Sequence, residues 1–192
     1  MSEIFISINS FLEAILFFDI LFGSMDGVHL PFLVVWLILG GVYLTILTKF
    51  INLRAMKHSF DIIRGRYKTA EDRGEISPFG ALTTALSATV GLGNIAGVAL
   101  AVSIGGPGAT FWMIIAGFLG MSLKFTEVTL SLKYREFLPD GTVMGGAMEY
   151  LSKGLAEKGY AKIGKILSLI FAVFMIGGAI GGGNVFQVSQ TL

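Results

Sequence analysis

The residues most able to do chemistry lie in an uncharged stretch from Phe79 to Ile104, where positions 87–97 read Ser-Ala-Thr-Val-Gly-Leu-Gly-Asn-Ile-Ala-Gly. Gly91 and Gly93 precede the amide Asn94. Glycine costs roughly 1 kcal/mol relative to alanine in a helix interior, so the pair weakens any helix. Non-helical backbone at membrane depth is tolerated only where protein or a wet cavity covers it. The string therefore predicts a broken membrane helix, whose free carbonyls can bind a cation and whose free N–H groups can bind an anion.

Three polar side chains accompany the predicted break: Ser87, Thr89 and Asn94. Each carries a neutral oxygen, the ligand type that suits a hard cation such as sodium. Serine and threonine in membrane helices commonly bond to a preceding carbonyl of their own helix, so they mean little alone. The Asn94 amide is the stronger indication of a cation site, because an amide at membrane depth needs hydrogen-bond partners or ligands.

The glycines also have two other interpretations. Gly93 and Gly97 are four residues apart and form a small-residue face on which another helix can pack. From spacing alone this interpretation is as good as the first. The pattern from Gly91 to Ala96 also matches a dinucleotide-binding fingerprint, which we discard because no strand precedes it and its setting is a membrane span.

Lys124 and Glu127 are charged residues within a later apolar segment, and their spacing of three places them on one helix face. Charges this deep are rare and usually face the protein interior or a cavity. The simpler interpretation, which we favour, is a structural ion pair that locks two helices together. The alternative is that Glu127 hydrogen-bonds to the exposed backbone of the broken helix.

Asn184 and Gln187 follow a glycine-rich run from Gly177 to Gly183 and share one helix face. The glycines leave a groove where another element can approach closely. The two amides either make hydrogen bonds between helices, each typically worth well under 2 kcal/mol, or contact the polar head group of a substrate.

The composition is that of a membrane protein: 54% of the 192 residues are hydrophobic and 14% are charged, against about 25% charged in soluble domains. An enzyme is not expected. Cysteine is absent, and His29 and His58 lie far apart without an acid or hydroxyl partner at the spacing of a catalytic triad. No feature points to a nucleic-acid partner.

The elements that must position these residues are long apolar segments, measured against the roughly 20 residues that a membrane span needs. The first 22 residues carry acidic side chains and lack the basic start of a cleavable signal. We predict an external interfacial segment over 1–27, an extra transmembrane helix over 28–53, a basic cytoplasmic loop over 54–77, a broken helix over 78–104, a second helix over 109–134, a cytoplasmic amphipathic segment over 135–162 and a third helix over 163–192.

Basic residues predict the orientation. All 14 lysines and arginines follow residue 48, with seven in 49–73 and six in 133–165. The N-terminal 27 residues and the Gly105–Gly108 turn have none. Because cytoplasmic loops carry an excess of lysine and arginine, we predict a multi-pass protein of the cell membrane with its N-terminus outside and both basic loops in the cytoplasm.

The string Ala-Thr-Val-Gly-Leu-Gly-Asn-Ile-Ala-Gly-Val-Ala at 88–99, with Gly-Gly-Pro-Gly-Ala at 105–109 and Phe-Trp-Met at 111–113, closely resembles the sodium:alanine symporter family. The resemblance covers the whole chain. It implies an all-α integral membrane protein with the bacterial leucine-transporter-like fold, an inverted repeat of five plus five helices. The segment 28–53 would be an extra helix, and 78–104, 109–134 and 163–192 would be core helices 1, 2 and 3.

The resemblance also implies a sodium site at the broken helix. The carbonyl of Thr89 and the side chain of Asn94 would match one sodium site of the family's fold. The carbonyls of Ser87 and Val90 would match a second. Glu127 matches a glutamate near the broken helices, and with Lys124 it would have a structural or gating role.

The substrate site implied by the resemblance lies beside the sodium. The N–H groups of Leu92 and Gly93, next to Gly91, would hold the carboxylate of the substrate. Gln187 would lie over the substrate from core helix 3, where related transporters have a tyrosine, and Asn184 would contact its polar head group. The implied activity is uptake of small neutral amino acids, alanine or possibly glycine, with co-transported sodium.

The chain departs from the family in its length, because a ten-helix core does not fit in 192 residues. We expect an N-terminal fragment whose partner is the missing C-terminal half, and which does not transport alone. Two alternatives stay open: a transporter of the same fold with another ion or substrate, and a truncated, non-transporting membrane protein that binds a partner.

Overall fold

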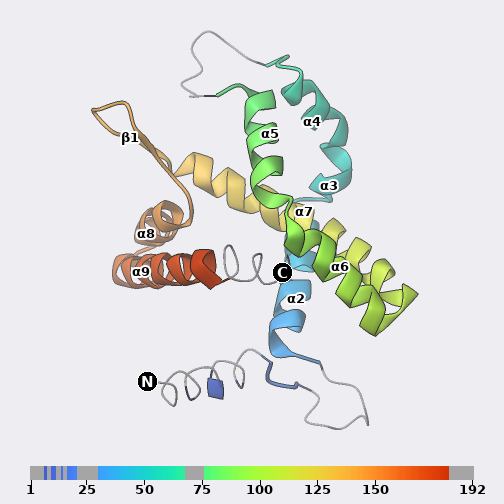
Figure 1. Ribbon diagram of the computed structural model, residues 1–192. Coiled ribbons are helices and arrows are strands. Elements are labelled where there is room, and N and C mark those ends of the chain that lie inside the picture. The colour runs from blue at the N-terminus through green and yellow to red at the C-terminus, as the bar shows by residue number, and fades with distance from the viewer. Residues whose placement is uncertain are drawn as a thin grey trace.

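The computed structural model of the chain describes residues 30–67 and 76–181, together with positions 7, 10, 11, 14 and 17–20; at 92 and 93 it describes the backbone only. Within these residues the chain is mostly helical, with one short hairpin (Figure 1). The elements are α2 (Phe32–Leu47), α3 (Ile51–Arg54), α4 (Met56–Ile63), α5 (Pro78–Thr89), α6 (Leu92–Gly105), α7 (Pro107–Lys133), β1 (Glu136–Phe137), β2 (Val143–Met144), α8 (Ala147–Glu157) and α9 (Ala161–Gly178).

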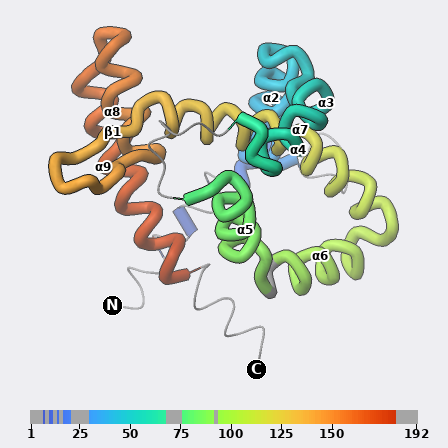
Figure 2. Tube along the Cα trace, turned by 90° about the horizontal axis from the view of Figure 1, so that it is seen from above, coloured from blue at the N-terminus to red at the C-terminus, as the bar shows by residue number. Residues whose placement is uncertain are grey.

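The long helix α7 connects two groups of helices. Seen from above, α8 and α9 lie together at one end of it, while α2, α3 and α4 gather around its middle (Figure 2). Helix α5 lies between the two groups in this view, and α6 runs outward to the start of α7 (Figure 2). Within the described residues no large apolar side chain is buried, so the apolar side chains face outward, as they do in helices that contact lipid.

Two described helices are long and apolar enough to cross a membrane: α7, and the helix that continues from Ala161 to Gly181. A third span results if the bent pair α5 and α6 is counted as one. The apolar helix α2 has 16 residues, fewer than the roughly 20 of a typical span. It ends where Lys49 and Phe50 both adopt left-handed backbone, with φ of 53° and 56°. A membrane span over 28–53 therefore stays a prediction.

The contact between α2 and α7 is the tightest packing in the first group. Gly41 of α2 is buried, and a Cβ atom there would lie 2.9 Å from Cβ of Leu119. One turn further along, Thr45 is 3% exposed and donates a hydrogen bond to the Gly41 carbonyl at 2.7 Å. Its hydroxyl oxygen lies 3.0 Å from that of Ser122, the one fully buried side chain among the described residues. Small residues thus bring two helices close enough for hydroxyl groups to bond across them.

A side-chain hydrogen bond fixes α3 to the same helix. Asn52 Nδ2 donates to the carbonyl of Phe118 on α7 at 3.2 Å. Because Asn52 is only 9% exposed, this contact orients the basic segment that follows α2 against the middle of α7.

The second group contains a β-hairpin that the all-α prediction omitted. Glu136 pairs with Met144 and Phe137 with Val143 in antiparallel strands. The turn between them uses Gly141 at φ 86°, and the carboxylate of Asp140 accepts a hydrogen bond from the N–H of Thr142 at 2.9 Å. The predicted amphipathic segment 135–162 is thus a hairpin followed by α8, and α9 begins at Ala161.

The hairpin and α8 are tied to the end of α7 by charged and aromatic side chains. Lys153 of α8 lies 2.7 Å from Glu136 of β1 and 2.7 Å from Glu149 of its own helix. The ring of Tyr134 covers Gly154, where an added Cβ atom would lie 3.3 Å from the ring, and its hydroxyl donates to Glu157 at 2.7 Å. Each exposed ion pair contributes little alone, but together these contacts fix α8 against α7.

A single residue separates α6 from α7. Gly106 ends one helix and begins the other with φ of 65°, a left-handed conformation that favours glycine. The next residue is Pro107, whose fixed φ suits the first position of a helix. The predicted tight turn at Gly105–Gly108 is confirmed in this form.

The packing of α2 on α7 predicts the effect of one added methyl group. We expect Gly41→Ala to lower the free energy of unfolding by about 1–3 kcal/mol, because the new Cβ atom forces the helices apart. The matched control is Gly40→Ala, since nothing lies within 4 Å of a Cβ atom at Gly40. Thermal unfolding in detergent, followed by circular dichroism, measures both variants; equal midpoints would show that the contact at Gly41 does not hold the helices together.

Candidate functional site

The candidate site is the junction of α5 and α6. Helix α5 ends at Thr89, and Val90 and Gly91 follow in extended backbone, with φ/ψ of −83°/111° and −151°/−175°. Helix α6 then begins at Leu92, and the two helices are bent by 52° relative to each other. Figure 1 shows the bend between the labels α5 and α6.

The local sequence explains why the helix stops here. Thr89 and Val90 are β-branched and lose side-chain freedom in a helix, and Gly91 offers no side chain to cap the helix that follows. The N–H of Val90 still donates to the Leu86 carbonyl at 2.9 Å, and the N–H of Asn94 donates to the Gly91 carbonyl at 3.1 Å. Between these two bonds the helical ladder is interrupted.

One side chain crosses the interruption. Asn94 Nδ2 donates to the carbonyl of Thr89 at 2.8 Å, so the first turn of α6 is tied to the last turn of α5. The structure thereby brings together two of the residues that the sequence predicts for one site, an amide group and a backbone carbonyl. The hydroxyl of Thr89 donates to the Ala85 carbonyl at 2.8 Å. The backbone carbonyl of Thr89 is therefore the polar group that this residue offers at the break.

The electrostatics of the junction suit two opposite charges. The first N–H groups of a helix and the last carbonyls of a helix have no partner within it. They carry partial charges of roughly +0.5 at the N-terminus and −0.5 at the C-terminus. At this junction the C-terminus of α5 and the N-terminus of α6 meet, and residues 85–100 contain no ionisable side chain. The arrangement can attract a cation to one side and a carboxylate to the other.

Ser87 lies on the surface of α5, in a shallow open depression that Thr83, Thr84 and Ala88 also line. Ser87 and Val90, whose carbonyls the sequence predicts for a second cation site, are exposed among the described residues. Gly97, the other member of the small-residue face, has nothing within 4 Å of an added Cβ atom. Asn184 and Gln187 lie outside the described residues.

The predicted pair on α7 is an ion pair within one helix, not the lock between two helices that we favoured from the sequence. Lys124 Nζ lies 3.0 Å from Glu127 Oε2, and the two side chains are 68% and 48% exposed. The hydrogen bond of Glu127 within the described residues goes to Lys124. Tyr150 of α8 lies near both charges. Burial and the nearby Glu127 carboxylate raise the pKa of Tyr150, and the positive charge of Lys124 partly opposes this rise.

Several residues that shape the site's surroundings were not predicted. Thr45, Asn52 and Ser122 hold α2 and α3 to α7, and Tyr150 places α8 beside the ion pair. Small hydroxyl residues on apolar helices were the available signal for Thr45 and Ser122. For Tyr150 it was the position of an aromatic ring with a polar end on the amphipathic segment.

A broken apolar helix with opposed helix ends, beside two helices long enough to cross a membrane, is the architecture of a membrane transporter rather than of an enzyme. The sequence profile of the Sodium:alanine symporter family matches residues 16–192. The chain therefore belongs to this family.

The chain is similar to several curated proteins. The "Sodium/alanine symporter AgcS" of Methanococcus maripaludis is 41% identical over 160 residues, which are 83% of this chain and 35% of that protein. A "Putative sodium/proton-dependent alanine carrier protein YrbD" of Bacillus subtilis is 38% identical over 174 residues, 87% of this chain and 35% of that protein. A "Probable sodium/glutamine symporter GlnT" of the same organism is 37% identical over 126 residues, 66% of this chain and 26% of that protein. The chain spans about a quarter to a third of the length of these relatives.

The closeness of Tyr150 to the ion pair predicts how its ionisation responds to two substitutions. Glu127→Gln removes a nearby negative charge, so we expect the pKa of Tyr150 to fall toward the usual tyrosine value; Lys124→Gln should raise it further. An ultraviolet titration of phenolate formation measures both shifts. Tyr150→Phe is the control that assigns the titration step, and a step unchanged by either charge substitution would mean that α8 does not lie beside the pair.

Proposed function

We propose that these residues supply the first part of a sodium-coupled symport site for small neutral amino acids, with alanine as the first candidate. The observation that carries the proposal is the contact between the Asn94 amide and the Thr89 carbonyl, which spans a helix break inside an uncharged apolar segment. Membership of the symporter family supports sodium as the co-transported ion.

The cation would be held by neutral oxygens around the break. The Thr89 carbonyl and the Asn94 amide oxygen would form one site, and the carbonyls of Ser87 and Val90 a second. In the described structure Asn94 presents Nδ2 to Thr89. Binding of sodium would turn the amide so that Oδ1 joins the carbonyl as a ligand, replacing a hydrogen bond by two ion–dipole contacts.

The substrate carboxylate would bind to the N–H groups at the start of α6, those of Leu92 and Gly93 beside Gly91. These groups have no acceptor within their own helix, and the helix dipole favours an anion there. Asn184 and Gln187 would complete the pocket from the predicted core helix 3, residues 163–192. A cation and a carboxylate on opposite sides of one break attract each other, and this attraction would couple the two binding events.

Sodium is favoured over a proton because residues 85–100 contain no side chain that could carry a proton at neutral pH. A tenfold sodium gradient supplies about 1.4 kcal/mol, and a membrane potential of 100 mV adds about 2.3 kcal/mol per charge. Together they can concentrate a neutral amino acid several hundredfold. The YrbD and GlnT relatives carry names that mention protons and glutamine, so these are the competing ion and substrate.

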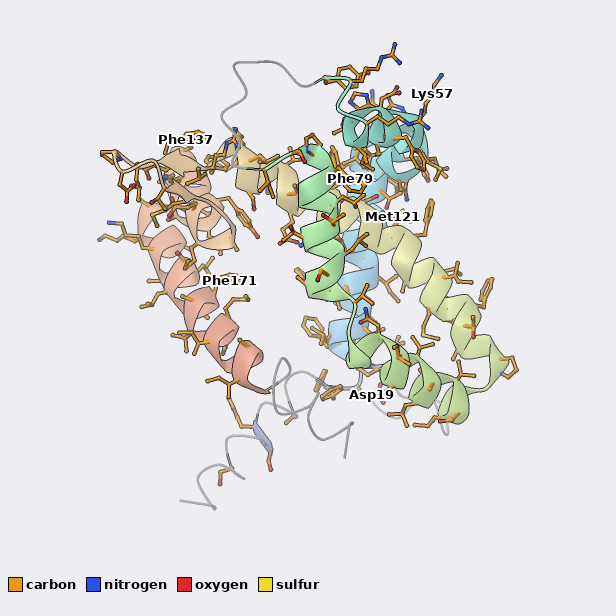
Figure 3. All side chains as sticks on the ribbon, turned by 45° about the horizontal axis from the view of Figure 1, so that its top comes forward. Asp19, Lys57, Phe79, Met121, Phe137 and Phe171 are labelled. Atoms are coloured by element: carbon orange, nitrogen blue, oxygen red, sulfur yellow. The ribbon has the colours of Figure 1, made fainter. Side chains whose placement is uncertain are left out.

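The shape of the chain supports the proposed orientation. Figure 3 shows Lys57 and Phe137 toward one end of the molecule and Asp19 toward the other. The described parts of both basic regions thus lie toward one end, opposite Asp19. We propose that the basic end faces the cytoplasm of a multi-pass protein in the cell membrane.

The test is a chimera in which residues 16–192 replace the matching part of the Methanococcus maripaludis relative, so that the helices beyond this chain are present. We expect alanine binding in detergent that is lost when choline replaces sodium. Asn94→Ala in the chimera should lower the sodium affinity at least about tenfold, because it removes a cation ligand.

The matched control is Ser103→Ala, which removes another polar group from α6; among the described residues the Ser103 hydroxyl bonds only to the Leu100 carbonyl, at 2.8 Å. It should leave sodium affinity unchanged. Alanine binding that is indifferent to sodium but changes with pH would support proton coupling instead. A chimera that elutes as a single species but binds glutamine and not alanine would overturn the choice of substrate. Binding by the 192-residue chain alone would overturn the expectation that its site is incomplete.

A further inference from the structure

Helices α3 and α4 act as one amphipathic helix. Ala55 separates them, but its N–H donates to the Ile51 carbonyl at 2.8 Å and its carbonyl accepts from the N–H of Ser59 at 2.8 Å. Helical spacing therefore continues across the junction. One side of this helix faces α7 and is mostly apolar, and the opposite side carries the charges.

The apolar side forms a groove with α7. A cavity of about 290 Å³, open on one side, is lined mainly by Ile51, Met56, Phe60 and Ile63 of the amphipathic helix and by Met121 and Phe125 of α7. Met56 and Phe60 are 53% and 59% exposed. An apolar groove this open needs an apolar occupant.

The charged side is strongly basic. Arg54, Lys57 and Arg64 are spaced by three and seven residues, which places them on one side of the helix. Residues 49–67 hold five basic side chains and one acidic, a net charge of +4. The acidic residue, Asp61, is paired with Arg66 at 3.5 Å. Lys57 and Arg64 have no carboxylate partner among the described residues.

The other basic region of the chain is different. Lys133 and Lys153 lie within 4 Å of the carboxylates of Glu157, Glu136 and Glu149, so part of its charge is neutralised within the protein. The uncompensated charge of α3 and α4 lies on the other side of the helix from the groove, and Lys57 and Arg64, three and four residues from Phe60, adjoin the edge of the groove. Figure 3 shows Lys57 at the outer side of these helices and Met121 further in, on α7.

We propose that α3, α4 and α7 form a binding site for an anionic phospholipid. One acyl chain lies in the groove, and the phosphate at the membrane surface is held by the flexible side chains of Arg54, Lys57 and Arg64, which reach around the helix. Charge complementarity selects an anionic over a zwitterionic lipid, and the groove selects a lipid over free phosphate. The bound lipid would fix the amphipathic helix in the plane of the membrane surface.

The experiment titrates the 192-residue chain, purified in mild detergent, with phosphatidylglycerol or with phosphatidylcholine of the same acyl chains, and counts bound lipids by native mass spectrometry. We expect phosphatidylglycerol to bind at least tenfold more tightly. The triple variant Arg54→Gln, Lys57→Gln, Arg64→Gln should bring the two lipids to equal affinity, because each basic residue near an anionic surface contributes about a fivefold factor at low salt.

Two further variants distinguish the contribution of the basic charge to lipid binding from the contribution of the groove. Lys158→Gln, Lys162→Gln, Lys165→Gln removes the same charge around the start of α9 and should change the affinity less than twofold. Ser59→Trp fills the groove without changing charge and should weaken phosphatidylglycerol binding at least fivefold. Circular dichroism checks that each variant keeps its helices.

Four results would overturn the proposal. Equal binding of the two lipids would remove the anionic selectivity, and an equal loss in the α9 variant would show attraction by overall charge. Displacement of the lipid by inorganic phosphate would show an anion site without an acyl chain. Unchanged lipid binding by Ser59→Trp would mean that the groove takes another occupant, such as a helix from further along the protein.

Discussion

Backbone polar groups inside a membrane must have partners, and the rest of this structure depends on how that requirement is met between Thr89 and Leu92. A continuous helix would satisfy every group by itself. Here the ladder is interrupted, and the amide of Asn94 supplies one replacement partner by bonding to the Thr89 carbonyl. The remaining carbonyls and N–H groups of the two helix ends are what a bound ion and a carboxylate would satisfy. Residues 85–100 contain no charged side chain, so no fixed charge there would compete with the proposed ion and carboxylate.

The scaffold around the break relies on small residues rather than on a buried apolar core. Gly41 permits close approach of α2 to α7, and the hydroxyls of Thr45 and Ser122 bond at that contact. In water such an interface would be a weak substitute for buried leucines. In a membrane, where apolar side chains gain little by leaving lipid for protein, close packing and hydrogen bonds between helices drive association. The same reasoning explains why large apolar side chains are exposed on the described helices.

Local signals could be predicted from the sequence, and distant contacts could not. Gly91 and Gly93 mark the position of the break, and the spacing of Lys124 and Glu127 predicts their ion pair, because both depend on neighbouring residues. The hairpin was missed because the prediction of one amphipathic segment over 135–162 assigned no turn to Pro139, Asp140 and Gly141, residues typical of a turn. The bond between Thr45 and Ser122 joins positions 77 residues apart, and no pattern in a single sequence pairs them. The roles of Asn184 and Gln187 stay predictions.

The connection between α6 and α7 has a consequence for movement. With Gly106 alone between them, these two helices have almost no slack, and the second is anchored at its far end by the hairpin and α8. A change in angle at Val90 and Gly91 would therefore be expressed mainly as a tilt of α5, while α6 keeps its place on α7. The junction would then be a hinge that moves α5 against its contact with α4. In the proposed symporter, access to the ion and substrate would be controlled by the helix that carries Thr89 rather than by the helix that carries Asn94.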